Sequence, residues 1–147
     1  MLKDAAGIEE EIVRHTAIMD EYDPQNRIGL LVDEWGAWHD EEPGTIRGFL
    51  YQRNTMRDAV LAGLSLNIFN RHSRRVQMAN IAQLVNVLQA PILTDGAKMV
   101  CTPTYYVFEM YAVHQDAKLL HAAVQTPDYT FGEITLPKVS VSSSLAE

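Results

Sequence analysis

The sequence predicts an α/β fold built on a parallel β-sheet, in a chain of 147 residues that is long enough for one modest domain. Residues 28–32 are apolar without polar alternation, which is typical of a strand buried on both faces, as in a parallel sheet covered by helices. A helical pattern and a second apolar strand follow, and this order makes a right-handed crossover between parallel strands. Asp33 and Glu34 come directly after the first strand, where α/β barrels carry their chemistry.

The first third of the chain predicts a helix, a strand and a long loop. Apolar residues recur at helical spacing over residues 5–21, and Pro24 lies in the turn that ends this helix. The strand over residues 28–33 follows. A polar loop then runs from residue 35 to about residue 53. It is long for a strand-to-helix connection, and long ordered loops are often functional.

The middle of the chain predicts the crossover helix and the second strand. Thr55, with Asp58 three residues later, predicts a capping box at the start of a helix over residues 55–73. The residues expected on one side of that helix are Met56, Val60, Leu61, Leu64 and Ile68. Residues 75–83 read as the next strand, although residues 79–88 could instead continue as a helix.

The remaining chain predicts a loop, a helix and a strand. Pro91 and the Asp95-Gly96 pair indicate a loop, and Pro103 suits the first turn of a further helix. The face expected to be apolar on this helix carries Val107, Met110, Tyr111 and His114. Residues 138–142 alternate with period two, which predicts a strand with one wet face. Two parallel strands are few for a sheet, so the chain is expected to be the last part of a larger barrel.

Composition narrows the function classes. The net charge of −7 argues against binding to nucleic acid or to an anionic membrane surface. The single Cys101 cannot form an internal disulfide, and the N-terminus lacks the apolar core of a signal peptide. No apolar stretch approaches the length of a membrane span. These features predict a cytoplasmic address, and none of them implies a metal or an organic cofactor.

The acid and indole groups after the first strand suit carbohydrate hydrolysis. Glu34 is the sharpest candidate, because retaining glycosidases use one carboxylate as nucleophile and a second as acid/base; the alternative is a solvated acid. Asp33 points the opposite way in extended chain and is expected to orient its neighbours. Trp35 and Trp38 could offer aromatic faces to a sugar ring, and their alternative is core packing.

Other polar groups are weaker candidates. The acid-rich residues 39–42 resemble a metal cluster by composition, but adjacent loop residues seldom converge on one ion, which favours a solvated loop. Gln83 and Asn86 are amides in an otherwise apolar stretch. Each needs a hydrogen-bond partner if it is buried, either a sugar hydroxyl or the backbone. Cys101 lacks the histidine and acid that thiol catalysis requires.

The segment Val-Asp-Glu-Trp-Gly-Ala-Trp at residues 32–38 resembles the nucleophile segment of the α-L-arabinofuranosidases of glycoside hydrolase family fifty-one. Further stretches fit the same family in the same order, at residues 48–52, 57–59, 80–88 and 104–111. The resemblance implies a retaining exo-hydrolase that releases terminal α-L-arabinofuranosyl units from arabinan, arabinoxylan or derived oligosaccharides. It also implies that the parent enzyme is a homo-oligomer.

By the same resemblance, residues 1–115 are the C-terminal portion of a catalytic (β/α)8 barrel, with its last two strands and helices. Residues 116–147 begin a β-sandwich. Glu34 matches the nucleophile, Trp38 an aromatic that lines the arabinose subsite, and Gln83 an amide that hydrogen-bonds the sugar. Gly36 stands where the family often has Asn, a change expected to loosen the loop.

The largest departure is the acid/base residue, a Glu preceded by Asn in the family. This chain has no Asn-Glu pair, so the parent is expected to be active and the chain alone inactive. Two alternatives stay open. One is another retaining barrel glycosidase with a different sugar preference, and the other is a non-catalytic module that binds sugar or protein.

Overall fold

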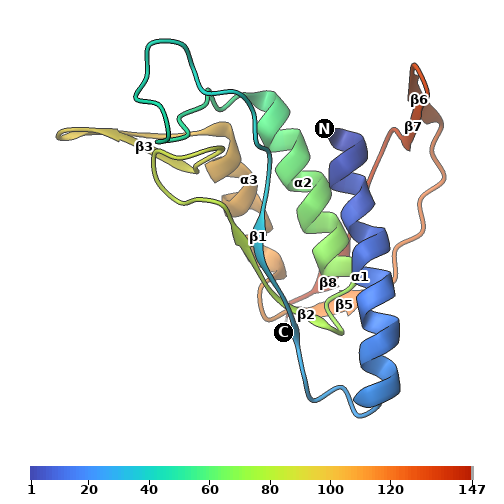
Figure 1. The fold of residues 1–147 in the computed structure, drawn as a ribbon. Coiled ribbons are helices and arrows are strands. Elements are labelled where there is room, and N and C mark those ends of the chain that lie inside the picture. The colour runs from blue at the N-terminus through green and yellow to red at the C-terminus, as the bar shows by residue number, and fades with distance from the viewer. Residues whose placement is uncertain (147) are drawn as a thin grey trace.

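A pair of parallel strands and the helix that connects them form the centre of the fold (Figure 1). The structure is a computed structural model that describes residues 1–146. Its elements are α1 (Leu2–Tyr22), β1 (Leu30–Trp35), α2 (Met56–Arg71), β2 (Val76–Ile81), β3 (Ile92–Asp95), β4 (Lys98–Cys101), α3 (Pro103–Tyr111), a 3-10 turn η1 (Ala112–His114), β5 (Lys118–Leu120), β6 (Asp128–Phe131), β7 (Ile134–Pro137) and β8 (Ser143–Leu145). This mixture of helix and parallel strand confirms the α/β prediction. Within residues 1–146, no helix combines the length and the apolar character needed to cross a membrane.

The strand–helix–strand unit forms as its sequence predicts. β1 and β2 pair in parallel, from Leu30 opposite Val76 to Trp35 opposite Ile81. Thr55 caps α2, and its backbone N–H donates to the Asp58 carboxylate at 2.8 Å. This reciprocal capping satisfies N–H groups that the first turn of a helix leaves free. The strand interpretation of residues 75–83 is confirmed over Val76–Ile81, and the helical alternative for residues 79–88 is wrong.

The core lies between the strand pair and the three helices. Ile12 of α1, Ile68 and Phe69 of α2 and Val107 of α3 are buried together. Trp35, the last residue of β1, packs its ring edge-on to Phe69 at 5.2 Å between centroids. Trp35 therefore follows the core-packing alternative rather than a sugar-binding role.

The opposite face of the strand pair is exposed among the described residues. Leu31 of β1 is 50% exposed and Met78 of β2 is 52% exposed. The prediction that residues 28–32 form a strand buried on both faces is therefore wrong for this chain. All three helices contribute to the core on one face, and side chains of successive strand residues point to alternate faces.

The expected helix faces need a similar correction. Met56 and Val60 of α2 are exposed, and so is Met110 of α3. Leu61 and Ile68 are buried as expected, and the side of α2 that faces the core also carries Ala59 and Ala62. Small alanine side chains let the helix approach the strands closely, whereas Met56 and Val60 lie outside this contact.

Arg75 connects the start of β1 to the start of β2. Its guanidinium group donates to Asp20 and to Asp23, each at 2.7 Å, and to the Ile28 carbonyl at 3.0 Å. The Leu30 N–H donates to the Arg75 carbonyl at 2.6 Å. The hydrogen bonds from Arg75 lower the pKa of both carboxyl groups. The turn between α1 and β1 is thereby fixed beside the end of α2.

A hairpin replaces the loop expected around Pro91. β3 and β4 pair in antiparallel register, with Asp95 opposite Lys98 and Gly96 at a positive φ of 56° in the tight turn. A glycine at the first central position suits a two-residue hairpin turn. Apolar residues lie in both segments beside the Asp-Gly pair, so the signal for a hairpin is present in the sequence and the prediction of a loop is wrong here.

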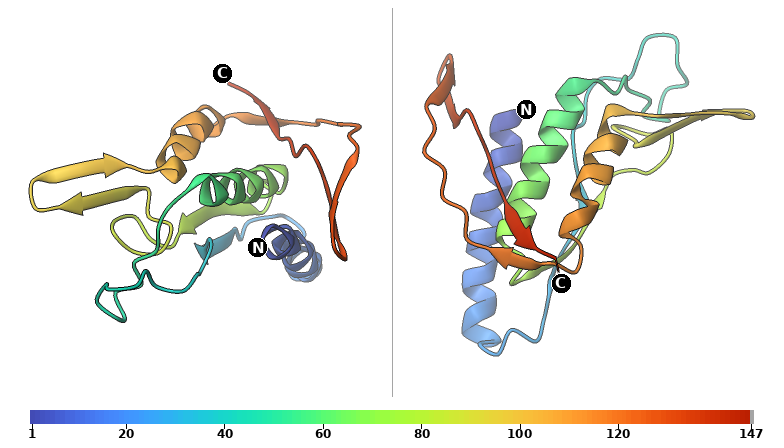
Figure 2. Two further views of the ribbon diagram at one scale, coloured as in Figure 1. Left: turned by 90° about the horizontal axis from the view of Figure 1, so that it is seen from above. Right: turned by 180° about the vertical axis from the view of Figure 1, so that it is seen from behind.

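The C-terminal segment runs alongside α2 (Figure 2). β5 pairs with β8 and β6 with β7, both antiparallel. The predicted strand at residues 138–142 is wrong, because β7 ends at Pro137 and β8 begins at Ser143. Asn67 donates to the Ser140 carbonyl at 2.9 Å and Arg71 donates to the Val141 carbonyl at 3.2 Å. Side chains of α2 therefore occupy the backbone groups that a strand would use.

Candidate active site

The three residues predicted for the site lie at the carboxyl end of the strand pair. Glu34 is the penultimate residue of β1, Trp38 follows the end of β1 by three residues, and Gln83 follows the end of β2 by two. The carboxyl ends of parallel strands meet at one edge of a sheet. The last backbone hydrogen bond between the two segments joins the Ala82 N–H to the Trp35 carbonyl at 3.0 Å. The fold thus places the segment that contains Glu34 and Trp38 beside the segment that contains Gln83.

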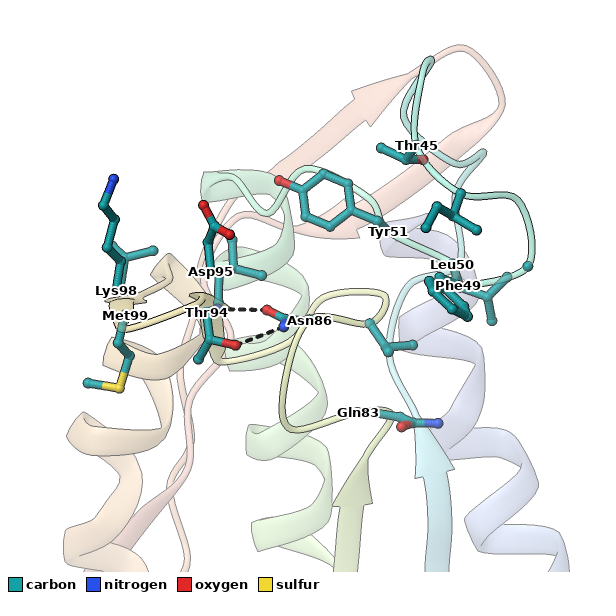
Figure 3. Close-up of a pocket in the computed structure, with 15 residues that line it drawn as sticks. Thr45, Phe49, Leu50, Tyr51, Gln83, Asn86, Thr94, Asp95, Lys98 and Met99 are labelled. Carbon is teal, nitrogen blue, oxygen red and sulfur yellow. Dashed lines mark hydrogen bonds between the residues drawn. The ribbon is translucent and has the colours of Figure 1, made fainter.

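Several cavities lie at this edge, and one of about 520 Å³ is lined by Glu34, Trp38 and residues of α1. Glu34 and Trp38 line a small cavity of about 170 Å³ together with Leu88 and Gln89. Gln83 lines a larger one of about 940 Å³ between the loop after β1 and the β3–β4 hairpin. Figure 3 shows Gln83 near the strand ends, below Asn86, in that larger cavity. The structure therefore places Glu34 and Trp38 in one cavity and Gln83 in its neighbour.

The larger cavity is lined by apolar side chains together with polar ones such as Asn86, Thr94 and Lys98. Phe49 and Leu50 belong to the loop after β1, and Met99 to the hairpin. The amide of Asn86 exchanges two hydrogen bonds with Thr94, at 2.7 and 2.9 Å, which ties the hairpin to the segment after β2 (Figure 3). The hydrogen-bond partner of the Asn86 amide is therefore Thr94, within the protein.

Trp38 and Trp35 have different environments although only two residues lie between them. The Trp38 side chain is 70% exposed, whereas Trp35 is buried in the core. Exposed indole beside a carboxylate is available to a ligand, and its face can contact the C–H groups of a sugar ring. Glu34 and Gln83 are exposed as well.

The acid-rich segment at residues 39–42 organises the loop. One carboxylate oxygen of Glu41 accepts the N–H groups of Gly48 at 2.6 Å and of Leu50 at 2.8 Å. This contact closes the loop on itself. Among the residues that the structure describes, no group of three or more His, Cys, Asp or Glu side chains could hold a metal ion.

Two buried glutamines, Gln52 and Gln89, were missed from the sequence. Both are only 1% exposed. Gln89 accepts the Ala37 N–H at 2.7 Å and donates to the Ala82 carbonyl. Gln52 accepts the His39 N–H at 2.9 Å and donates to the Ala37 carbonyl at 3.1 Å. Their signal was a long amide at the edge of an apolar stretch, the same signal that singled out Gln83.

Gly36 fits the space beside Gln89. Its φ of 133° favours glycine, and a Cβ atom there would lie 2.2 Å from the Gln89 side-chain nitrogen. The prediction that Gly36 loosens the loop stays a prediction. Its missing side chain is what allows the buried amide to reach the backbone of the loop.

A carboxylate, an exposed indole and an amide at the carboxyl edge of parallel strands are the groups that a sugar-hydrolysing site uses. Comparison with known proteins agrees with this class. The profile of a family described as "Alpha-L-arabinofuranosidase C-terminal domain" matches residues 33–145. The chain belongs to this family.

Curated relatives carry related names. An "Intracellular exo-alpha-L-arabinofuranosidase" of Bacteroides ovatus is 53% identical over 138 residues, which cover 93% of this chain and 27% of that protein. An "Intracellular exo-alpha-(1->5)-L-arabinofuranosidase 1" of Bacillus subtilis is 32% identical over 117 residues, which cover 74% of this chain and 23% of that protein. The chain thus spans about a quarter of the length of these relatives.

Solved structures share the fold. The GH51 arabinofuranosidase from Xanthomonas axonopodis pv. citri superposes with a TM-score of 0.95 at 52% identity, over 97% of this chain and 29% of that one. An α-L-arabinofuranosidase from Thermotoga maritima, solved as an arabinose complex, gives a TM-score of 0.70 at 21% identity, over 96% of this chain and 28% of that one. The second likeness concerns the fold alone.

Proposed function

We propose that this chain carries the nucleophile and part of the sugar-binding site of a retaining exo-α-L-arabinofuranosidase. The observation that carries the proposal is the position of Glu34. It lies at the carboxyl end of a parallel strand, in one cavity with the exposed Trp38, in a chain that is 53% identical to a named arabinofuranosidase. The substrates are terminal α-L-arabinofuranosyl units of arabinan, arabinoxylan or derived oligosaccharides.

Each residue has a defined role in this proposal. Glu34 attacks the anomeric carbon and forms a covalent glycosyl-enzyme intermediate, which water then hydrolyses. The indole of Trp38 contacts one face of the arabinose ring. The Gln83 amide hydrogen-bonds a sugar hydroxyl from the end of the neighbouring strand.

A second carboxylic acid must protonate the departing glycosidic oxygen. We place the acid/base Glu elsewhere in the parent enzyme. The chain of residues 1–147 alone is accordingly expected to be inactive.

The proposed architecture follows from the same assignment. Residues 1–115 contribute the C-terminal portion of a (β/α)8 barrel, in which β1 and β2 are strands seven and eight. Residues 116–147 begin a β-sandwich, which the antiparallel pairing of β5 with β8 and of β6 with β7 supports. The exposed apolar face of β1 and β2 is then covered by earlier barrel elements of the parent.

The proposal also concerns setting and partners. The relatives named "intracellular" support a cytoplasmic address. The saccharide is the proposed partner, in a parent enzyme that forms a homo-oligomer. Neither nucleic acid nor a membrane is a proposed partner, and the mechanism uses no metal and no organic cofactor.

The test uses the full-length enzyme that carries this chain. Glu34→Gln keeps the shape of the side chain and removes the nucleophile, so turnover of an aryl α-L-arabinofuranoside is expected to fall by orders of magnitude while arabinose binding persists. Glu10→Gln, on an exposed position of α1, is the matched control and should leave turnover unchanged. Near-normal turnover of Glu34→Gln would remove Glu34 from the role.

Two further measurements separate the finer claims. NMR of the first-formed product distinguishes retention from inversion, and an inverted anomer would refute the double displacement. Assays with aryl β-xyloside and β-glucoside test the sugar preference, because cleavage of pyranosides alone would favour another barrel glycosidase. Gln83→Ala is expected to cost about 1–3 kcal/mol of transition-state binding, as for a lost buried hydrogen bond.

A further inference from the structure

The buried amide of Gln89 joins the two segments that carry the proposed sugar-binding residues, and the buried amide of Gln52 holds the segment of Trp38. We propose that these glutamines are positioning residues that fix Trp38 and Gln83 relative to Glu34. The proposal rests on the proposed function, since it concerns the geometry of the same site. It assigns a role to two side chains that lie behind the cavity and that act through the backbone.

Gln89 extends the strand pairing beyond its last backbone hydrogen bond. The final backbone contact joins the Ala82 N–H to the Trp35 carbonyl at 3.0 Å. The Gln89 side chain then accepts the Ala37 N–H at 2.7 Å and donates to the Ala82 carbonyl. The side-chain amide of Gln89 therefore continues the hydrogen bonding between the two segments. The residues that it holds, Ala37 and Ala82, directly precede Trp38 and Gln83.

Gln52 fixes the other side of Trp38. It accepts the His39 N–H at 2.9 Å and donates to the Ala37 carbonyl at 3.1 Å. Both backbone groups of Ala37 are thus bonded to buried amides, and the residue after Trp38 is bonded as well. The indole projects from a backbone that is held on both sides, although its side chain is 70% exposed.

The chemistry of this position requires an amide. Ala37 and Ala82 present one N–H and one carbonyl to the same side chain, so Gln89 must accept one hydrogen bond and donate another. Both glutamines are 1% exposed, which leaves little access for water to replace a lost partner. A buried backbone group without a partner costs more than the hydrogen bond itself contributes.

The glutamines themselves are held by a second layer of contacts. Asn54, two residues after Gln52, donates to the Gln89 carbonyl at 3.0 Å. The Leu88 N–H donates to the Leu50 carbonyl at 2.9 Å. The two segments that supply the glutamines therefore brace each other. Such supporting contacts hold functional side chains in a fixed geometry.

The test substitutes each glutamine by methionine, which keeps the length and removes both hydrogen bonds, in the full-length enzyme. With an aryl α-L-arabinofuranoside, KM and the inhibition constant of arabinose are each expected to rise about tenfold, as one lost buried interaction predicts. A purely structural defect would instead lower the apparent kcat through a smaller folded fraction and leave KM unchanged. Gln77→Met removes an exposed amide near the opposite end of β2 and should change neither constant.

A double-mutant cycle checks that the effect passes through Trp38. In a Trp38→Ala background, Gln52→Met should raise KM far less than in the wild-type enzyme, because coupled residues are non-additive. Additive effects would overturn the proposal. Where Gln89→Met fails to fold, Gln52→Met carries the test alone.

The outcomes separate this inference from the proposed function. If Trp38→Ala and Gln83→Ala raise KM while both glutamine variants keep the wild-type value, the positioning roles of Gln52 and Gln89 are wrong. If Trp38→Ala and Gln83→Ala leave KM unchanged, the proposed sugar contacts are wrong, and the glutamines have nothing to position.

Discussion

Replacing Arg75 by methionine is expected to open the turn between α1 and β1. The Arg75 side chain is 1% exposed, and it pairs with Asp23, which is 5% exposed. Methionine fills similar space but leaves the buried Asp23 carboxylate with only the exposed Arg27 guanidinium, at 3.7 Å, as a cation. It also removes the donor to the Ile28 carbonyl, at 3.0 Å. Breaking a buried ion pair by removing one partner is among the most destabilising single changes.

Hydrogen exchange in the full-length enzyme measures this effect locally. The informative amides are those of Ile28, which donates to Asp23 at 2.8 Å, and of Leu30, which donates to the Arg75 carbonyl at 2.6 Å. Their exchange is expected to accelerate roughly a hundredfold or more, from the usual cost of an uncompensated buried charge. Unchanged protection of residues 23–30 would refute the reasoning.

Arg74→Met is the matched control for this experiment. Arg74 is the neighbouring residue, its side chain is 59% exposed, and it also pairs with Asp20. Exposed ion pairs contribute little to stability. The control should therefore leave the exchange of residues 23–30 within about threefold of the wild-type rate.

The remaining predictions concern a turn, the C-terminal segment and pH. Gly36→Ala adds a Cβ atom 2.2 Å from Gln89 at a φ of 133°, so it is expected to destabilise the enzyme by about 1–3 kcal/mol, seen as a lower Tm; an unchanged Tm would contradict this contact. Asn67→Ala removes the donor to the Ser140 carbonyl at 2.9 Å and should speed limited proteolysis of residues 138–145, whereas equal cleavage rates would show that the segment is held otherwise. The pKa of Asp23 is lowered by its hydrogen bond with the buried Arg75, so the stabilisation from this pair is present at neutral pH and is lost as the pH falls below the ordinary carboxyl value of 3.8. Urea titrations at several pH values should show this loss of unfolding free energy. An unfolding free energy that rises on acidification would contradict the prediction.

Local sequence signals predicted the central elements because each has a local physical cause. The capping box of Thr55 and Asp58 begins α2 where expected, and the apolar run before Glu34 forms β1, although its start shifts to Leu30. The position of Glu34 at the strand end followed from the same run. Spacing along the chain is sufficient where hydrogen bonds form between near neighbours.

Long-range contacts explain what the sequence did not predict. Gln52 and Gln89 act on backbone groups 7 to 52 residues away, so their role depends on how two loops pack. The strand expected at residues 138–142 failed because side chains of α2, including Asn67, bind its backbone carbonyls. Burial of residues 28–32 was overestimated because a continuous apolar run does not show which face a neighbouring element covers.

The β3–β4 hairpin lines the larger cavity but takes no part in the buried hydrogen bonds of Gln52 and Gln89. The hairpin projects from the body of the fold (Figure 1), and residues 94–100 at its tip are exposed. Its turn needs little more than a glycine at position 96 with its positive φ. Insertions and replacements at such a tip are well tolerated, so the hairpin can change in length and composition while the strand ends stay in place. A change in the hairpin would therefore alter the lining of the larger cavity without rebuilding the groups around Glu34.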